Sequence, residues 1–158
     1  MSDSQKVDII LTELGAMMAI DSINKHDEDS WSIQFEDNKL VELFYISNQH
    51  KLTLQYNIGI PTLSEVNKLH DLLLEYNLCW PESGGIQMAL NKTDGSIVQL
   101  FQLFIQDLSL PIMIDVLTNF IERADIWQAI IHDESFFNQK KSVKSVSNYN
   151  RFSSQLLI

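Results

Sequence analysis

The residues able to do chemistry are few and lie far apart in this sequence. The four histidines, His26, His50, His70 and His132, show none of the mutual spacings that metal sites use. The segment 26–29, with the sequence His-Asp-Glu-Asp, offers candidate ligands, but adjacent residues of one loop rarely converge on a single ion. We interpret it as a solvated acidic loop and expect no metal.

The other candidates for catalysis or cofactor binding have simpler structural interpretations. Cys79 has no basic neighbour that would activate its thiol, so we expect a small buried hydrophobe. Gly84 and Gly85 precede a predicted strand, whereas a phosphate-binding loop precedes a helix. No nucleophile elbow, HExxH run or Walker-type run occurs. We therefore predict no enzyme and no cofactor; a small-molecule hydrolase or transferase would require a deep polar pocket with converging carboxylates and histidine.

Composition and charge exclude several classes of partner. The chain has 158 residues, of which 45% are hydrophobic, enough for one sizeable core. Eleven basic and 21 acidic residues give a net charge of −10, which disfavours binding to nucleic acid and to anionic membranes. The sequence shows no signal peptide and no apolar run near the ~20 residues that span a bilayer. We expect a cytoplasmic protein.

The charge divides the chain into two parts. Residues 133–158 hold four basic and two acidic residues together with six serines, a net charge of +2. Residues 1–132 hold the other seven basic and 19 acidic residues, a net charge of −12. We predict one domain over 1–132, followed by a flexible or conditionally ordered tail over 133–158 that folding does not need.

Three segments show helical periodicity. The first runs from Ser4, as N-cap, to about Ile20; the second follows Pro61 and Thr62 to about residue 76; the third covers 109–132. Thr62 and Glu65 have the spacing of a capping box. The first two helices are apolar over a wide arc, which is typical either of well-buried core helices or of helices with a second stripe for a partner.

The alternation of apolar and polar residues that is typical of β-strands occurs in five segments: 31–36, 39–47, 52–58, 86–91 and 96–105. The polar stretch 21–30 is interpreted as a loop, so the strand 31–36 is expected at a sheet edge. Short links favour antiparallel pairing. The predicted fold is α+β, a mostly antiparallel twisted sheet with three helices in the order α-β-β-β-α-β-β-α.

A central segment carries a resemblance to a known family. Its matching residues are Asn77-Leu78-Cys79-Trp80, Gly84-Gly85, Ile86, Met88, Leu90, Asp94-Gly95, Leu100, Gln102 and Phe104. In these motifs, and in size, acidity and element order, the chain resembles the class I type III secretion chaperones, the Tir chaperone family. The resemblance spans roughly residues 4–132; the tail and the turn 80–83 depart from the family pattern.

The resemblance implies a homodimeric, bacterial cytoplasmic chaperone without ATP hydrolysis. Such proteins bind an N-terminal segment of a secreted effector in extended form and keep it secretion-competent, which associates them with virulence. A secretion ATPase is a further partner that the resemblance implies. The rival hypothesis is an adaptor or regulatory protein-binding domain of the same fold without a secretion role.

Two sets of apolar residues are candidates for these contacts. The effector is expected to add a strand at the edge formed by 31–36, with its side chains entering pockets beside the first helix. The predicted effector-binding residues are Ile9, Met17, Ile20, Trp31, Ile33, Phe35, Phe44 and Tyr45. The predicted dimer interface consists of Val66, Leu69, Leu73, Tyr76, Val98, Leu100 and Phe104. Taken singly, each effector-binding residue fits a core position equally well.

Overall fold

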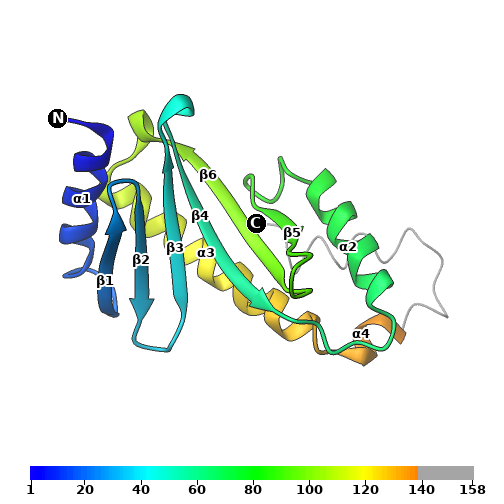
Figure 1. Ribbon diagram of the computed structural model, residues 1–158. Helices are drawn as coiled ribbons and strands as arrows, with labels where there is room; N and C mark the ends of the chain where they lie inside the picture. The colour runs from blue at the N-terminus through cyan, green and yellow to red at the C-terminus, as the bar shows by residue number, and fades with distance from the viewer. Residues whose placement is uncertain (139–158) are drawn as a thin grey trace. The chain divides into compact units, whose positions relative to one another are not determined.

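The computed structural model describes residues 1–138, which form an α+β fold around one six-stranded sheet with the strand order β1-β2-β3-β4-β6-β5 (Figure 1). The strands are β1 (Ile20–Asp27), β2 (Ser30–Phe35), β3 (Leu40–Ile46), β4 (Lys51–Gly59), β5 (Gln87–Leu90) and β6 (Ile97–Phe104). The α-helices are α1 (Asp3–Leu14), α2 (Val66–Leu78), α3 (Leu110–Ile130) and α4 (Glu134–Asn138). Two short 3-10 turns, η1 (Ser47–Gln49) and η2 (Ile105–Asp107), complete the order.

These elements divide into two compact units. The first unit contains residues 1–56 and 100–120, and the second contains 57–99 and the described residues from 121 onward. The third predicted helix is confirmed as α3, and the predicted strands are confirmed as β2 to β6 within two residues at each end. No helix within residues 1–138 is long and apolar enough to cross a membrane.

In the first unit, α1 begins two residues earlier and ends six residues sooner than predicted. Its N-cap is Ser2, whose side chain accepts from the backbone of Gln5 while the Gln5 side chain accepts from the backbone of Ser2. Ser4, the predicted cap, is buried in the first turn, and its hydroxyl donates to the carbonyl of Glu28. The helix ends at Leu14, because the chain turns at Gly15 to start β1.

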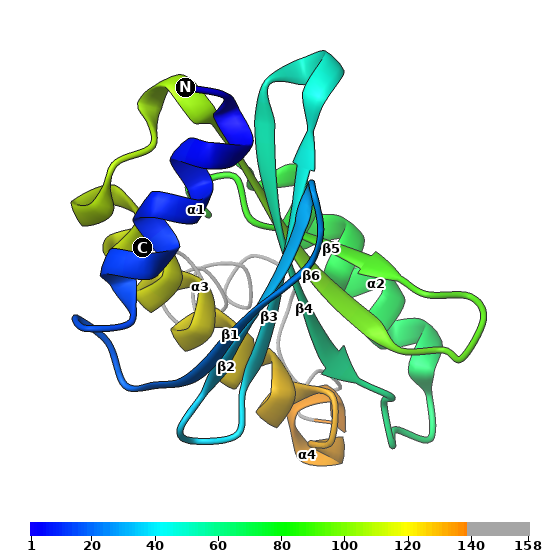
Figure 2. The same ribbon diagram turned by 60° about the vertical axis from the view of Figure 1, so that its left-hand side comes forward.

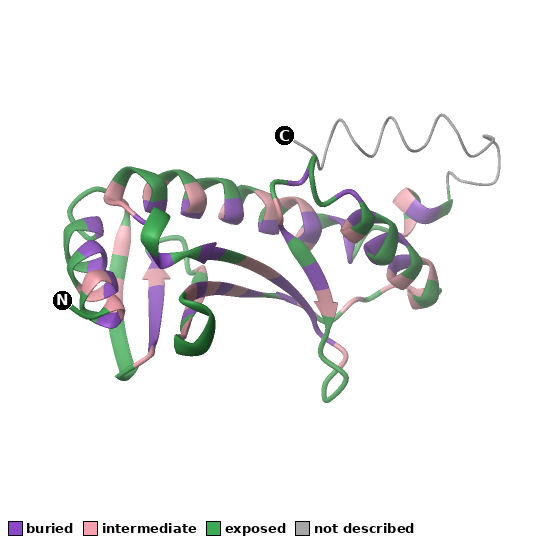
Figure 3. Ribbon diagram, turned by 90° about the horizontal axis from the view of Figure 1, so that it is seen from above, coloured by how far each residue is buried: buried purple, intermediate pink, exposed green. Residues whose placement is uncertain are grey.

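The prediction of a loop over 21–30 is wrong, because most of this stretch is the edge strand β1. It pairs antiparallel with β2, with Ile23 opposite Ile33 and Asn24 opposite Ser32. Figure 3 shows β1 largely exposed beside a mostly buried β2. An edge strand with solvated side chains needs no apolar alternation, so the pattern that reveals β2 is missing from β1. Consequently β2 is an inner strand, and the edges of the described sheet are β1 and β5.

The two faces of the first unit's sheet differ sharply. On one face Trp31 pairs with Leu43 and Ile33 pairs with Val41, and all four side chains are buried. This face carries α1, which lies next to β1 and β2 in both Figure 1 and Figure 2. On the opposite face Phe44 pairs with Ser30, and 37% of the Phe44 residue surface stays exposed.

The second unit is organised around α2. The predicted capping box is wrong: α2 begins at Val66, and the Thr62 hydroxyl lies 2.9 Å from Nδ1 of His132 instead of capping the helix. A T-shaped contact between Tyr76 and Trp127, with ring centroids 5.1 Å apart, lies in its core. The link between β5 and β6 contains Gly95, whose φ of +79° favours glycine.

The described residues include a short helix after residue 132, the predicted domain limit. Residues Glu134–Asn138 form α4, in which Phe137 is buried. The side chain of Glu134 accepts hydrogen bonds from the backbone and hydroxyl of Ser64, which ties α4 to the segment before α2. The rest of the predicted tail, 139–158, lies outside the described residues.

Candidate functional site

The predicted effector-binding residues divide into buried and exposed groups. Trp31, Ile33 and Phe35 are core residues with exposed fractions of 2%, 0% and 6%. Ile9 and Met17 are exposed at 49% and 63%. The remaining three are Phe44, exposed on the opposite sheet face, and Ile20 and Tyr45, both half-buried.

Two of the exposed apolar residues of the first unit are Ile9 on α1 and Met17 in the turn before β1. In the same unit the outer edge of β1 has no neighbouring strand among the described residues. Unpaired backbone N–H and C=O groups at an exposed edge are a template for strand addition. Exposed apolar side chains and a free strand edge in one unit favour the binding of an extended peptide.

Asp8 on α1 holds this edge in position. One of its oxygens accepts from the Trp31 indole N–H at 2.8 Å, and the other accepts from Lys25 of β1 at 2.7 Å. The Lys25 ammonium also lies 5.4 Å from the centroid of the Trp31 ring. Partial desolvation raises the pKa of Asp8, but the hydrogen bonds from Lys25 and Trp31 outweigh it, so the pKa is lowered overall. The carboxylate therefore stays charged at neutral pH and joins α1, β1 and β2.

Tyr45 has a structural partner as well. Its hydroxyl donates to Asp3 at 2.7 Å, and Nδ1 of His50 lies 3.0 Å from the same carboxylate oxygen. The hydrogen bond to Asp3, followed by desolvation, raises the pKa of Tyr45 to about 12. The hydrogen bonds from His50 and then Tyr45 lower the pKa of Asp3. Tyr45 thus connects the start of α1 to the β3–β4 hairpin.

The predicted dimer residues are mostly inside the fold. Leu69, Leu73, Tyr76 and Val98 are buried in the second unit, with exposed fractions between 0% and 8%. Val66 and Leu100 are half-buried. Phe104 is exposed at 48%, and the Lys51 ammonium lies 5.1 Å from the centroid of its ring.

Sequence reasoning missed the apolar residues that α2 does expose. Leu74 and Leu78 are 71% and 80% exposed, and Trp80, in the turn directly after the helix, is 61% exposed. Leu74 and Leu78 lie four residues apart and therefore stack along one side of α2. The signal was present in the sequence, since these positions lie on the opposite side of the helix from Leu69, Leu73 and Tyr76.

Most of the histidines and Cys79 have structural surroundings in the described part of the chain. They contain no group of three or more histidine, cysteine, aspartate or glutamate side chains that could hold a metal ion. Three of the four histidines have structural partners, in that His26 contacts Ser32, His50 contacts Asp3 and His132 contacts Thr62. Cys79 is buried, as predicted.

Comparison with known proteins connects this fold and surface to a family. The model of the Tir chaperone protein (CesT) family matches residues 9–128, most of the chain. The chain belongs to this family. The resemblance inferred from the motif-bearing segment is thereby confirmed, and it is a resemblance to chaperones, not to a family of enzymes. A search of curated proteins finds no match.

Solved structures of secretion chaperones share the fold of this Tir chaperone family member. The ExsC–ExsE complex contains a chain with 21% identity and a TM-score of 0.72, covering 85% of this chain and 100% of that one. The Yersinia pestis type III secretion chaperone SycH, solved with a stable fragment of YscM2, has 29% identity, a TM-score of 0.60 and coverage of 79% and 98%. In the HopA1–SchA chaperone–effector complex the corresponding values are 13%, 0.66, 80% and 95%.

Proposed function

We propose that this chain is a type III secretion chaperone of the bacterial cytoplasm that binds the N-terminal segment of a secreted effector in extended form. It keeps the segment soluble and competent for export, and it catalyses no reaction. Family membership supports the chaperone role. The observation that carries the binding mode is the free outer edge of β1 in the same unit as exposed Ile9 and Met17.

The effector segment adds to the sheet as a strand beside β1. The binding edge is therefore β1 and not the expected strand 31–36, because β1 pairs with β2 on that side. Backbone hydrogen bonds along β1 supply affinity for any extended chain, and alternate side chains of the effector supply specificity. Those on the same face as Trp31 lie on the α1 side of the sheet, while those on the other face lie beside the exposed residues of β1, such as Asn24. The net charge of −10 favours an effector segment that is basic.

The chaperone forms a homodimer through the exposed side of α2. Leu74, Leu78 and Trp80 supply the apolar centre of this interface in place of the buried Leu69, Leu73 and Tyr76. An exposed apolar row on a soluble protein is typical of an interaction surface. A secretion ATPase is a further candidate partner of the loaded dimer.

An adaptor role without secretion is the alternative function. An uncharacterized protein from Methanothermobacter thermautotrophicus shares the fold, with a TM-score of 0.57 and 13% identity. Co-purification of this chain with N-terminal segments of secreted proteins separates the two roles, because an adaptor would ignore those segments.

A pair of proline variants tests strand addition. Neighbouring backbone donors of β1 point to opposite edges, so Ile23→Pro and Asn24→Pro remove one donor facing β2 and one facing outward. The variant that keeps wild-type thermal stability is the one that lost the outward donor. We expect this variant to lose the co-expressed effector segment in affinity purification. Full retention of the segment by this folded variant would contradict strand addition at β1.

A further inference from the structure

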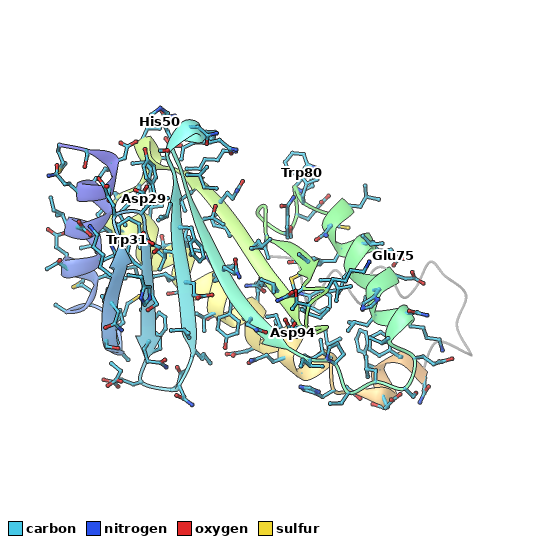
Figure 4. The ribbon with its side chains drawn as sticks, viewed as in Figure 1. Asp29, Trp31, His50, Glu75, Trp80 and Asp94 are labelled. Atoms are coloured by element: carbon cyan, nitrogen blue, oxygen red, sulfur yellow. The ribbon has the colours of Figure 1, made fainter. Side chains whose placement is uncertain are left out.

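The outer side of α2 carries an apolar row and an acidic row next to each other. Leu74 and Leu78 form the apolar row, and Asp71 and Glu75, also exposed, form the acidic row. Both pairs are spaced four residues apart and so stack along the helix. Glu75 projects from α2 on the outer side, away from β5 (Figure 4). We call these four residues the α2 outer face.

This arrangement is unfavourable for an isolated helix. Carboxylates four residues apart repel each other, and leucines that are exposed to water lack the stabilisation that burial of their apolar surface would give. Neither Asp71 nor Glu75 forms an ion pair within residues 1–138, although the nearby Lys68 pairs with Glu65. The α2 outer face is therefore complementary to a segment that is both basic and apolar.

The chain itself contains such a segment. Residues 139–158 carry four basic and no acidic residues, whereas residues 1–138 carry seven basic and 21 acidic residues. Three of the basic residues, Lys140, Lys141 and Lys144, lie together, and the segment ends with Leu156, Leu157 and Ile158. No other stretch of this length in the sequence combines such a charge with apolar residues.

The point at which this segment leaves the described chain lies in the same unit as α2. The last described residue is Asn138 at the end of α4. Four residues earlier Glu134 is hydrogen-bonded to Ser64, just ahead of α2. Twenty residues reach up to about 65 Å when extended, and a 13-residue helix is about 20 Å long. The segment is therefore long enough to cover the α2 outer face.

We propose that residues 139–158 bind the α2 outer face of their own chain. The lysines contact Asp71 and Glu75, and apolar side chains of the segment cover Leu74 and Leu78. Because the proposed dimer uses Leu74 and Leu78, the segment competes with a second copy for the same surface. The tether gives the segment a high effective concentration, so a weak contact suffices to limit dimerisation at low protein concentration.

Carbodiimide cross-linking of the full-length chain tests the contact directly, because it joins a lysine to a carboxylate only where the two touch. Mass spectrometry of a mixture of 15N-labelled and unlabelled chains separates links within a chain from links between chains. We expect Lys140, Lys141 or Lys144 to join Asp71 or Glu75 within one chain. The yield should fall several-fold at high salt and in Leu74→Ser, which keeps both carboxylates.

Glu122 provides the internal control, because it is an exposed carboxylate of the same unit on α3. Any of three results would overturn the proposal. These are cross-links spread evenly over Glu122 and the α2 carboxylates, cross-links only between chains, and no cross-links. Sedimentation then tests the competition, and the K140S/K141S/K144S variant should dimerise more tightly than wild type at low salt. If this variant dimerises no more tightly than wild type, the segment does not compete with a second copy for the α2 outer face. A chain that is monomeric in every variant refutes the proposed dimer, while the cross-links still report the contact.

Discussion

Removing the Asp8 carboxylate should destabilise the first unit by leaving a buried donor without its partner. The Trp31 indole N–H is 2.8 Å from Asp8, and Trp31 is only 2% exposed. In Asp8→Ala this part-buried N–H loses its acceptor, which costs about 1–3 kcal/mol. The ion pair with Lys25 adds at most about 1 kcal/mol, because both side chains are roughly 40% exposed.

Urea unfolding of three variants separates these contributions. Lys25→Met removes the ion pair and leaves the indole hydrogen bond, so it should lower the free energy of unfolding by less than about 1 kcal/mol. Asp8→Ala should lower it by about 2 kcal/mol. The Trp31→Phe background has no indole donor. In this background the loss of unfolding free energy caused by Asp8→Ala should decrease to about the loss caused by Lys25→Met.

The pH dependence of the same variants provides a second check. The Asp8 pKa is lower in the folded chain than its usual value of 3.8, so its contribution is present above that value and is lost as the pH falls through the folded pKa. The difference in free energy of unfolding between wild type and Asp8→Ala should therefore become smaller below about pH 4. If Asp8→Ala is no less stable than Lys25→Met at pH 7, the hydrogen bond between Asp8 and Trp31 does not stabilise the packing of α1 on β2.

Three further changes have defined outcomes. Leu78→Asp should convert the dimer to a monomer at micromolar concentration in light scattering without unfolding the chain, and persistence of the dimer would exclude this side of α2. Asp3→Asn should move the Tyr45 pKa from about 12 back toward 10 in a spectroscopic titration, because the charged acceptor that raises it is gone; an unchanged titration would rule out the contact. Gly95→Ala should destabilise the chain by about 1 kcal/mol in thermal unfolding, because φ is +79° although the space around it is open; no loss would show that the turn adapts.

Much of the sheet could be predicted from sequence because its inner strands bury one face. In β2 the apolar residues Trp31 and Ile33 alternate with Ser32 and its polar neighbours, so the period of two marks the strand, although the serine is buried as well. The strand β1 could not be predicted in this way, because its pairing uses the backbone while most of its side chains face water. The first helix was predicted too long because Met17 continues the apolar helical spacing, although it lies in the turn after the helix.

The candidate surfaces were harder to predict than the elements that carry them. Apolar alternation marks Ile33 as facing inward or toward a partner, but it does not say which, and the structure places it in the core. On α2 the apolar residues occupy two sides of the helix, so periodicity separates Leu73 from Leu74 but does not say which of the two is buried. That choice depends on where the sheet lies relative to the helix, which is information from tertiary structure.

Hydrogen exchange of a chaperone–effector complex tests the central claim most directly. The full-length chain would be co-purified with the N-terminal segment of a secreted protein, and its amide exchange would be compared with that of the free chain. We predict slower exchange along β1, residues 20–27, and unchanged exchange at the opposite edge strand β5. Unchanged exchange along β1 in a stable complex would contradict strand addition at this edge.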